Sequence, residues 1–187
     1  MSHDVNGLAS ATPPPGGADV STFEGIYAEY FEFTWRVLKN LVGRSGGVED
    51  AAQELWTVVH RRLGDFEQRS SVRTWLFGIA INVARNQRRA ESKHEALELL
   101  PEVVPSAGSD PEAARATNET WRSLERFLAA LEEPDRAIFV SSVIEDLSAK
   151  ETAEAVGVGV MLVYQRVRTL RRLAKAWLEL HERGNLE

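Results

Sequence analysis

Apolar residues recur every three to four positions along most of this 187-residue chain. That spacing places them on one face of a helix, whereas a half-buried strand requires strict alternation. The pattern runs through residues 22–42, 49–63 and 72–89, and it returns in several segments after residue 117. We find no stretch with strand alternation and no internal repeat. The sequence therefore predicts an all-α protein.

The helices fall into two small domains joined by a segment of different composition. Residues 91–117 hold six acids against two bases, Lys93 and Arg115, and two prolines flank the sequence EVV. This composition is typical of a flexible acidic linker, and its length allows a reach of about 90 Å. We assign a first domain to residues 21–90, the linker to 91–117 and a second domain to 118–182. Residues 1–20, which include three consecutive prolines, are predicted to be a disordered tail.

The sequence lacks the residues that several kinds of functional site require. The chain has no cysteine, which excludes disulfides and thiolate chemistry. Its four histidines are scattered without metal-ligand spacing, and there is no phosphate-binding glycine loop or catalytic triad. No apolar run approaches the ~18 residues of a membrane span, and the N-terminus lacks the features of a secretory signal. We therefore expect a cytoplasmic, non-catalytic protein without metal or cofactor.

The segment 68–90, QRSSVRTWLFGIAINVARNQRRA, is basic in an otherwise acidic protein. It contains five arginines and no acid, although the formal net charge of the chain is −6. Positive charge follows phosphates, aromatic rings stack on bases, and amides pair with base edges. On a helix the core face would consist of Val72, Trp75, Leu76, Ile79 and Val83. A polar stripe would lie roughly 80–90° around, formed by Asn82, Arg85, Asn86 and Arg89. For an isolated helix, an ordinary solvated flank is the commoner interpretation.

A second candidate for nucleic-acid binding is the segment 147–175. It predicts a short helix capped by Ser148, a turn containing Gly157 and a longer helix, which together form a helix-turn-helix. The buried stripe of the last helix is predicted to be Val160, Val163, Val167, Leu170 and Ala174. Basic and amide side chains point the other way, as a helix in the major groove requires. A plain helical hairpin with a solvated basic face is the alternative.

With both segments in view, the chain resembles a bacterial RNA polymerase sigma factor of the small extracytoplasmic-function group of the sigma-70 family. The first domain is similar to sigma region 2 through VEDAAQELW (48–56), GDF (64–66) and the pattern TWL-x-x-IA-x-N-x-A-x-N (74–86). The second domain is similar to region 4 through residues 131–158 and the helix that follows. The order and spacing of the two units also match, and the acidic linker resembles the segment that such proteins thread through polymerase.

The resemblance implies a role for several positions. The helix that docks on the β′ clamp helices of core polymerase corresponds to Asp50, Gln53 and Glu54. Positions that capture an extruded base of the −10 element correspond to Phe66, Asn82 and Asn86. Positions that help hold the melted strand correspond to Ser70, Ser71, Arg73 and Trp75, and Arg85 lies in the same stripe as the asparagines. Positions that read the −35 element or lie near its phosphates correspond to Tyr164, Gln165, Arg168, Thr169, Arg171 and Arg172.

The implied partners are core RNA polymerase, through its β and β′ subunits, and promoter DNA. Members of the group often have an anti-sigma factor, and the sequence leaves open whether this chain has one. The chain departs from the common pattern at Trp56, where a phenylalanine is usual, and at Met161, Leu162 and Thr169 in the recognition helix. A stand-alone helix-turn-helix regulator with a dimerisation or sensing bundle is the alternative function. A sensing domain, however, would have no need of the asparagine-bearing basic helix. An all-α enzyme or scaffold is a third alternative, and the absence of any catalytic constellation argues against it.

Overall fold

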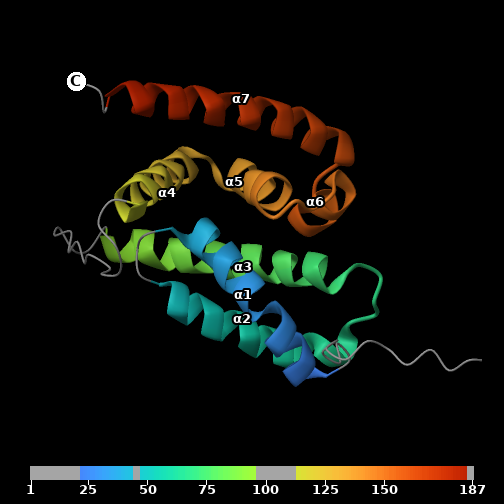
Figure 1. The fold of residues 1–187 in the computed structure, drawn as a ribbon. Helices are drawn as coiled ribbons and strands as arrows, with labels where there is room; N and C mark the ends of the chain where they lie inside the picture. The colour runs from blue at the N-terminus through green and yellow to red at the C-terminus, as the bar shows by residue number, and fades with distance from the viewer. Residues whose placement is uncertain (1–21, 44–46, 96–112, 185–187) are drawn as a thin grey trace, which may run out of the picture.

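The computed structural model describes residues 22–43, 47–95 and 113–184, and every regular element within these ranges is helical. Figure 1 shows their arrangement. In chain order the elements are α1 (Phe23–Val42), α2 (Val48–Arg62), η1 (Leu63–Asp65), α3 (Val72–Glu95), α4 (Ala113–Ala130), α5 (Glu133–Phe139), η2 (Val140–Ile144), α6 (Ala149–Val156) and α7 (Val160–Gly184). The predicted all-α class is confirmed. None of the described helices is long and apolar enough to cross a membrane.

Helices α1, α2 and α3 form the first domain. Thr22 caps α1, since its Oγ1 accepts a hydrogen bond from the Gly25 amide at 3.1 Å. Fully buried aliphatic side chains from all three helices meet in the core, among them Ile26, Leu55 and Leu76. On α1, Phe33 and Val37 also lie in the core, whereas Tyr27 is 41% exposed.

Helices α4 to α7 form the second domain, which contains the predicted helix-turn-helix. Ser148 begins α6 with a capping box: its Oγ accepts from the Glu151 amide at 3.2 Å, and Glu151 Oε2 accepts from the Ser148 amide at 3.0 Å. Gly157 ends α6 with a φ of 77°, a left-handed conformation that favours glycine. On α7, Val163 and Leu170 are buried as predicted. Val160 is 40% exposed, because it begins the helix beyond the edge of the core.

The segment between α4 and α6 is not one regular helix. Helix α5 passes at Val140 into η2, one turn of π-helix, which ends where the Glu145 amide donates to the Val140 carbonyl at 2.9 Å. Asp146 then adopts a φ of 53° and turns the chain toward α6. This turn directs the side chain of Glu145 out of its own domain.

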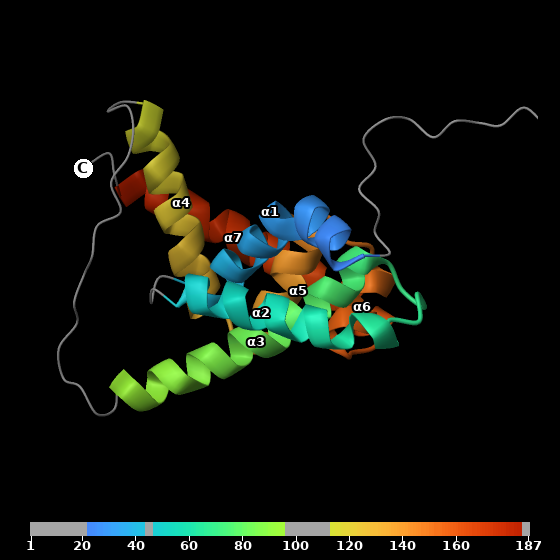
Figure 2. The same cartoon turned by 90° about the horizontal axis from the view of Figure 1, so that it is seen from below.

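The two domains pack against each other through α3 and α6 (Figures 1 and 2). Helix α3 lies between α1 and α2 on one side and α6 on the other, so most of its side chains from Thr74 to Ala84 are buried. The helices cross closely at Gly78, where an added Cβ would lie 3.7 Å from the Ala155 carbonyl oxygen. A linker able to reach about 90 Å therefore joins domains that are in contact.

The linker predicted at residues 91–117 is partly helical in the structure. Helix α3 extends to Glu95 and α4 already begins at Ala113, so both ends of the predicted 91–117 linker are helical. Residues 96–112 and the predicted tail at 1–20 lie outside the described residues.

Candidate nucleic-acid interface

The start of α3 carries a pair of stacked aromatic rings. Phe66 follows η1, Trp75 lies in the first turn of α3, and their ring centroids are 4.6 Å apart at an interplanar angle of 26°. Both side chains are half-buried. Ser71 caps the helix, because its Oγ accepts a hydrogen bond from the Thr74 amide at 3.1 Å. This local geometry fixes the rings at the surface of the first domain, where a base could stack on them.

Asn82 and Asn86 lie one helical turn apart on α3, and neither is buried although most of their neighbours on the helix are. The Asn82 Nδ2 donates to the Gly78 carbonyl at 3.0 Å, which fixes the orientation of the amide. The structure thus confirms that the two asparagines share a polar stripe beside the core face. It also shows that Phe77, the other aromatic residue of this segment, is fully buried.

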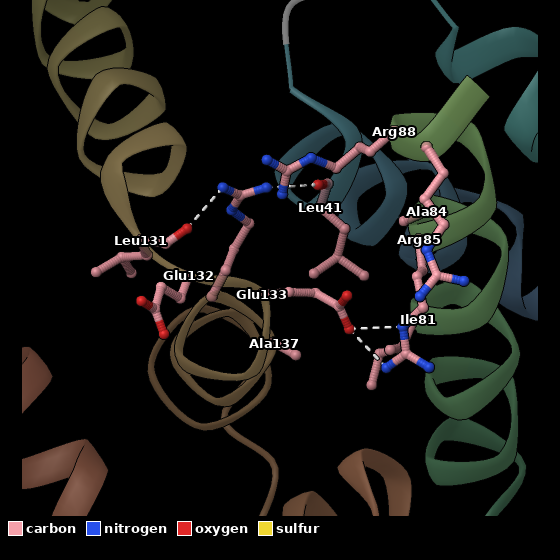
Figure 3. Close-up of a pocket in the computed structure, with 11 residues that line it drawn as sticks. Leu41, Ile81, Ala84, Arg85, Arg88, Leu131, Glu132, Glu133 and Ala137 are labelled. Carbon is pink, nitrogen blue, oxygen red and sulfur yellow. Dashed lines mark hydrogen bonds and ion pairs between the residues drawn. The ribbon is translucent and has the colours of Figure 1, made fainter. Parts of the chain in front are cut away.

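Three residues of the predicted −10 set contact acids of the second domain. The Arg85 Nε donates to Glu133 Oε1 at 2.7 Å beside a crevice of about 340 Å³ between the domains (Figure 3). Arg73 donates from Nη2 to the Glu145 backbone carbonyl at 2.9 Å. Ser71 Oγ donates to Glu151 Oε1 at 3.3 Å. The basic segment therefore faces an acidic surface of the same chain.

These acids are residues whose role the sequence did not indicate. Glu133 and Glu151 have the spacing of ordinary surface acids on helices, and only the packing of the domains brings them to α3. The hydrogen bonds from Ser148, and then those from Ser71 and Thr74, hold the pKa of Glu151 below its usual value. The one available signal was charge, since 68–90 has no acid whereas residues 131–158 hold seven acids against two bases, Arg136 and Lys150.

Arg36 of α1 is a further functional candidate that the sequence did not indicate. It binds the Glu145 carboxylate with two parallel hydrogen bonds from one edge of its guanidinium, Nε to Oε1 at 2.8 Å and Nη2 to Oε2 at 2.7 Å. This hydrogen bonding raises the pKa of Arg36. Nothing in the periodicity of α1 distinguishes Arg36 from other exposed polar residues.

The predicted −35 residues lie on the outer side of α7. Tyr164 is 63% exposed, and Thr169, which is partly covered, donates from Oγ1 to the Gln165 carbonyl at 3.2 Å. The other members of the set are all exposed: Gln165, Arg168, Arg171 and Arg172. Arg166 points back and donates to Asp135 of α5 at 3.3 Å, which ties the helix to its domain. A surface of basic and amide side chains is suited to the major groove.

The three predicted polymerase-docking residues, Asp50, Gln53 and Glu54, are exposed on α2. Gln53 also lines a groove of about 600 Å³ between α1 and α2, whose aromatic lining consists of Phe23, Tyr27, Phe31, Trp35, Trp56 and His60. Trp56 is 7% exposed, and its Nε1 has no hydrogen-bond partner among the described residues. The docking helix therefore borders an apolar surface with one unsatisfied donor. Within the described ranges no group of three His, Asp or Glu side chains could hold a metal ion.

Two family models match the chain, sigma-70 region 2 at residues 26–94 and sigma-70 region 4 at residues 121–173. The "ECF RNA polymerase sigma-E factor" of Escherichia coli (strain K12) is 30% identical over 134 residues, which are 66% of this chain and 69% of that protein. The "RNA polymerase sigma factor YlaC" of Bacillus subtilis (strain 168) is 25% identical over 73% of this chain and 80% of its own length.

Two solved structures share the fold. One is the "sigma factor RpoE in complex with the anti-sigma factor NepR" from Bartonella quintana, with a TM-score of 0.67 and 16% identity, covering 84% of this chain and 96% of that one. The other is CnrH in complex with the cytosolic domain of CnrY, with a TM-score of 0.63 and 22% identity, covering 84% of this chain and 88% of that one. The fold of this chain is therefore shared with both of these solved structures.

Proposed function

This chain belongs to the extracytoplasmic-function group of sigma-70 factors, and from this we propose that α3 is the element with which it opens and reads the −10 element of its promoters. The protein acts as an RNA polymerase sigma factor in promoter recognition, and sigma factors are non-catalytic subunits that bind core polymerase and promoter DNA. We further propose which residues make these contacts, and we place the protein in the cytoplasm with the polymerase.

Base capture is assigned to the surface of α3. The observation that carries it is the accessibility of Asn82 and Asn86, one turn apart, on a helix whose other sides are largely buried. Extruding a base costs a few kcal/mol, and stacking returns ~1–3 kcal/mol per base. The Phe66–Trp75 pair would supply the stacking and the amides would bind the base edge. One small domain supplies too little energy to hold a whole transcription bubble, so core polymerase must provide the rest.

The −35 element is assigned to α7. Gln165 and Arg168 present an amide and a guanidinium to solvent on one face of a helix that follows a tight turn. Such side chains bind base edges in the major groove, and an arginine pairs with guanine by two hydrogen bonds. Arg171 and Arg172, farther along α7, would lie near phosphates. Met161, which is 70% exposed, stands where a small residue is usual, so we expect an unusual −35 preference.

Docking on the β′ clamp helices of core polymerase is assigned to α2. The exposed Asp50, Gln53 and Glu54 would bind polar side chains, and the aromatic groove beside Gln53 would bury apolar ones. Burying a polar group such as the indole N–H without a partner is unfavourable. The unsatisfied Nε1 of Trp56 therefore favours the binding of a partner that places a hydrogen-bond acceptor in the groove.

An anti-sigma factor is a further proposed partner. The RpoE structure that shares this fold is bound to the anti-sigma factor NepR. In the present chain, three acidic residues of the second domain accept hydrogen bonds from arginine or serine side chains on α3 or at its start. A partner that stabilised this packed arrangement would keep α3 from DNA.

The experiment that tests the proposed function is transcription by core polymerase plus this protein on genomic DNA, followed by sequencing of the 5′ ends of the transcripts. We expect transcription start sites that appear only when the protein is present and that share two sequence motifs upstream. Starts identical to those of core polymerase alone would contradict the proposal. Tight, specific binding of the protein alone to duplex DNA would instead indicate a stand-alone regulator.

A further inference from the structure

The carboxylate of Glu145 is held between two arginines of the other domain. Its side chain is only 1% exposed, and it accepts hydrogen bonds from Nη2 and Nε of the Arg36 guanidinium at 2.7 and 2.8 Å. Arg73 approaches from α3, with Nη2 2.9 Å from the Glu145 carbonyl and 3.5 Å from Oε2. A charge from one domain thus fills a basic site that the other domain provides.

The first domain holds its two arginines in place through its own contacts. The Arg73 guanidinium lies over the Phe33 ring, 4.7 Å from its centroid, so a cation–π contact fixes its position. Arg36 projects from α1, one turn after Glu32, which attracts it through space. The hydrogen bonds of both guanidiniums go to Glu145. If the domains separate, both arginines therefore lose these hydrogen bonds while Phe33 still holds one of them.

The same arrangement of donors suits a phosphate. An arginine fork binds carboxylate and phosphate oxygens with the same two parallel hydrogen bonds. The side chains of Arg36 and Arg73 remain 50% and 40% exposed, so the site opens to the surface. Arg73 also lies in the first turn of α3, which contains Trp75 of the Phe66–Trp75 stack. Arg73 and Trp75 point to different sides of α3 because they are two residues apart, so a single strand that met both would curve around the start of the helix.

We propose that Arg36 and Arg73 form a phosphate-binding cradle for the melted −10 strand, and that Glu145 occupies this cradle while the two domains are packed together. The proposal rests on the function assigned to α3 and adds a DNA-binding role for a residue of α1. It also makes the closed arrangement a competitor of DNA. The Glu145 carboxylate must leave before a backbone phosphate can take its place. The same two arginines would then bind the phosphate.

The test measures binding of the full chain to a fluorescent single-stranded oligonucleotide that carries the −10 segment mapped from transcript starts. Glu145→Gln keeps the shape of the side chain and removes its charge. We expect it to bind the oligonucleotide roughly tenfold more tightly than the wild type, the effect of about one charge-assisted contact. Adding Arg36→Ala to Glu145→Gln should remove this gain.

Two control variants distinguish phosphate binding by the cradle from a general separation of the domains. Arg126→Ala removes one exposed arginine of α4, whose guanidinium donates to the Arg122 carbonyl of its own helix, and should leave affinity unchanged. Glu133→Gln weakens the Arg85 contact between the domains by removing its negative charge, without touching Arg36. If Glu133→Gln gives the same gain as Glu145→Gln, and Arg36→Ala does not reduce either gain, then domain separation alone accounts for the tighter binding and the cradle is wrong.

A second measurement does not depend on the folding of a variant at a buried position. In holoenzyme with the half-exposed Arg36 changed to Ala, the slope of log affinity for the open promoter against log salt should fall by about 0.7, the value for one phosphate contact of a single strand. An unchanged slope and affinity would overturn the cradle. The start sites mapped with the wild-type protein test the proposed function independently, because they do not depend on which residue binds that phosphate.

Discussion

Arg136 is a buried charge that binds backbone rather than a carboxylate. It is 4% exposed, and it donates to the carbonyls of Leu128 and Leu131 at 2.6 and 2.8 Å and to Ala129 at 3.2 Å. These carbonyls are at the end of α4, where the helix leaves its last acceptors without partners. A weaker contact of 3.5 Å reaches the Leu41 carbonyl of α1. One side chain thus caps a helix of one domain and touches the other.

We predict that Arg136→Leu lowers the free energy of unfolding by roughly 2–4 kcal/mol, because several buried carbonyls lose charged donors at once. Urea unfolding followed by circular dichroism measures this change. Arg126→Leu, on the exposed side of α4, should change the free energy by less than about 0.5 kcal/mol. Equal effects of the two variants would show that the carbonyl contacts of Arg136 do not stabilise the fold.

Glu151 makes the fold sensitive to acid at one defined contact. Its folded-state pKa is lowered, chiefly by the Ser148 hydrogen bonds, so its contribution to stability is complete above the ordinary pKa of glutamate. That contribution is lost as pH falls through the lowered pKa. We predict that the stability difference between wild type and Glu151→Gln is largest near neutral pH and shrinks below about pH 4.3.

Thermal unfolding of the two proteins between acidic and neutral pH measures this difference, with Glu154→Gln as a variant that removes one charge from the same helix. A difference that stays constant down to the lowest pH would contradict the assignment.

Among the elements, α3 shows what periodicity can and cannot predict. Its apolar spacing predicted one core face with a polar stripe beside it, and Leu76, Ile79 and Val83 do lie in the core. The burial of Phe77 and the close approach of Gly78 to α6 could not be predicted, because they depend on a second domain. The same reason applies to α1, where the spacing of its aromatic residues does not distinguish a buried face from a groove.

The α3–α6 crossing leads to a prediction at Gly78. An added Cβ would lie at an ordinary contact distance of 3.7 Å from the Ala155 carbonyl oxygen, and alanine favours a helix over glycine by about 1 kcal/mol. We therefore expect Gly78→Ala to raise the thermal midpoint. Gly78→Leu should force α6 away from α3 and lower it.

The distance between fluorophores on α2 and α7 would show the accompanying separation of the domains. If Gly78→Leu were as stable and as compact as Gly78→Ala, the close crossing of α3 and α6 would not limit the size of this side chain.

At the scale of the whole molecule, the sequence indicated the two domains, their class and their kinds of site. Their contact could not be predicted, since it depends on Glu133, Glu145 and Glu151 meeting particular partners on α1 and α3. A protein of net charge −6 repels DNA as a whole. The packed arrangement adds a local reason, because its own acids occupy part of the basic surface. We therefore expect promoter binding to depend on core polymerase separating and positioning the domains.

The central claim is that α3 captures bases of the opened −10 element, and permanganate reactivity of unpaired thymines in the holoenzyme–promoter complex tests it most directly. Wild-type holoenzyme should give reactive thymines in the −10 segment. Asn82→Ala and Asn86→Ala should bind core polymerase as the wild type does but lose about tenfold of that reactivity, the effect of one lost set of base contacts. Gln87→Ala, a change of a neighbouring amide on α3, should retain it. Normal opening by both asparagine variants would contradict the claim.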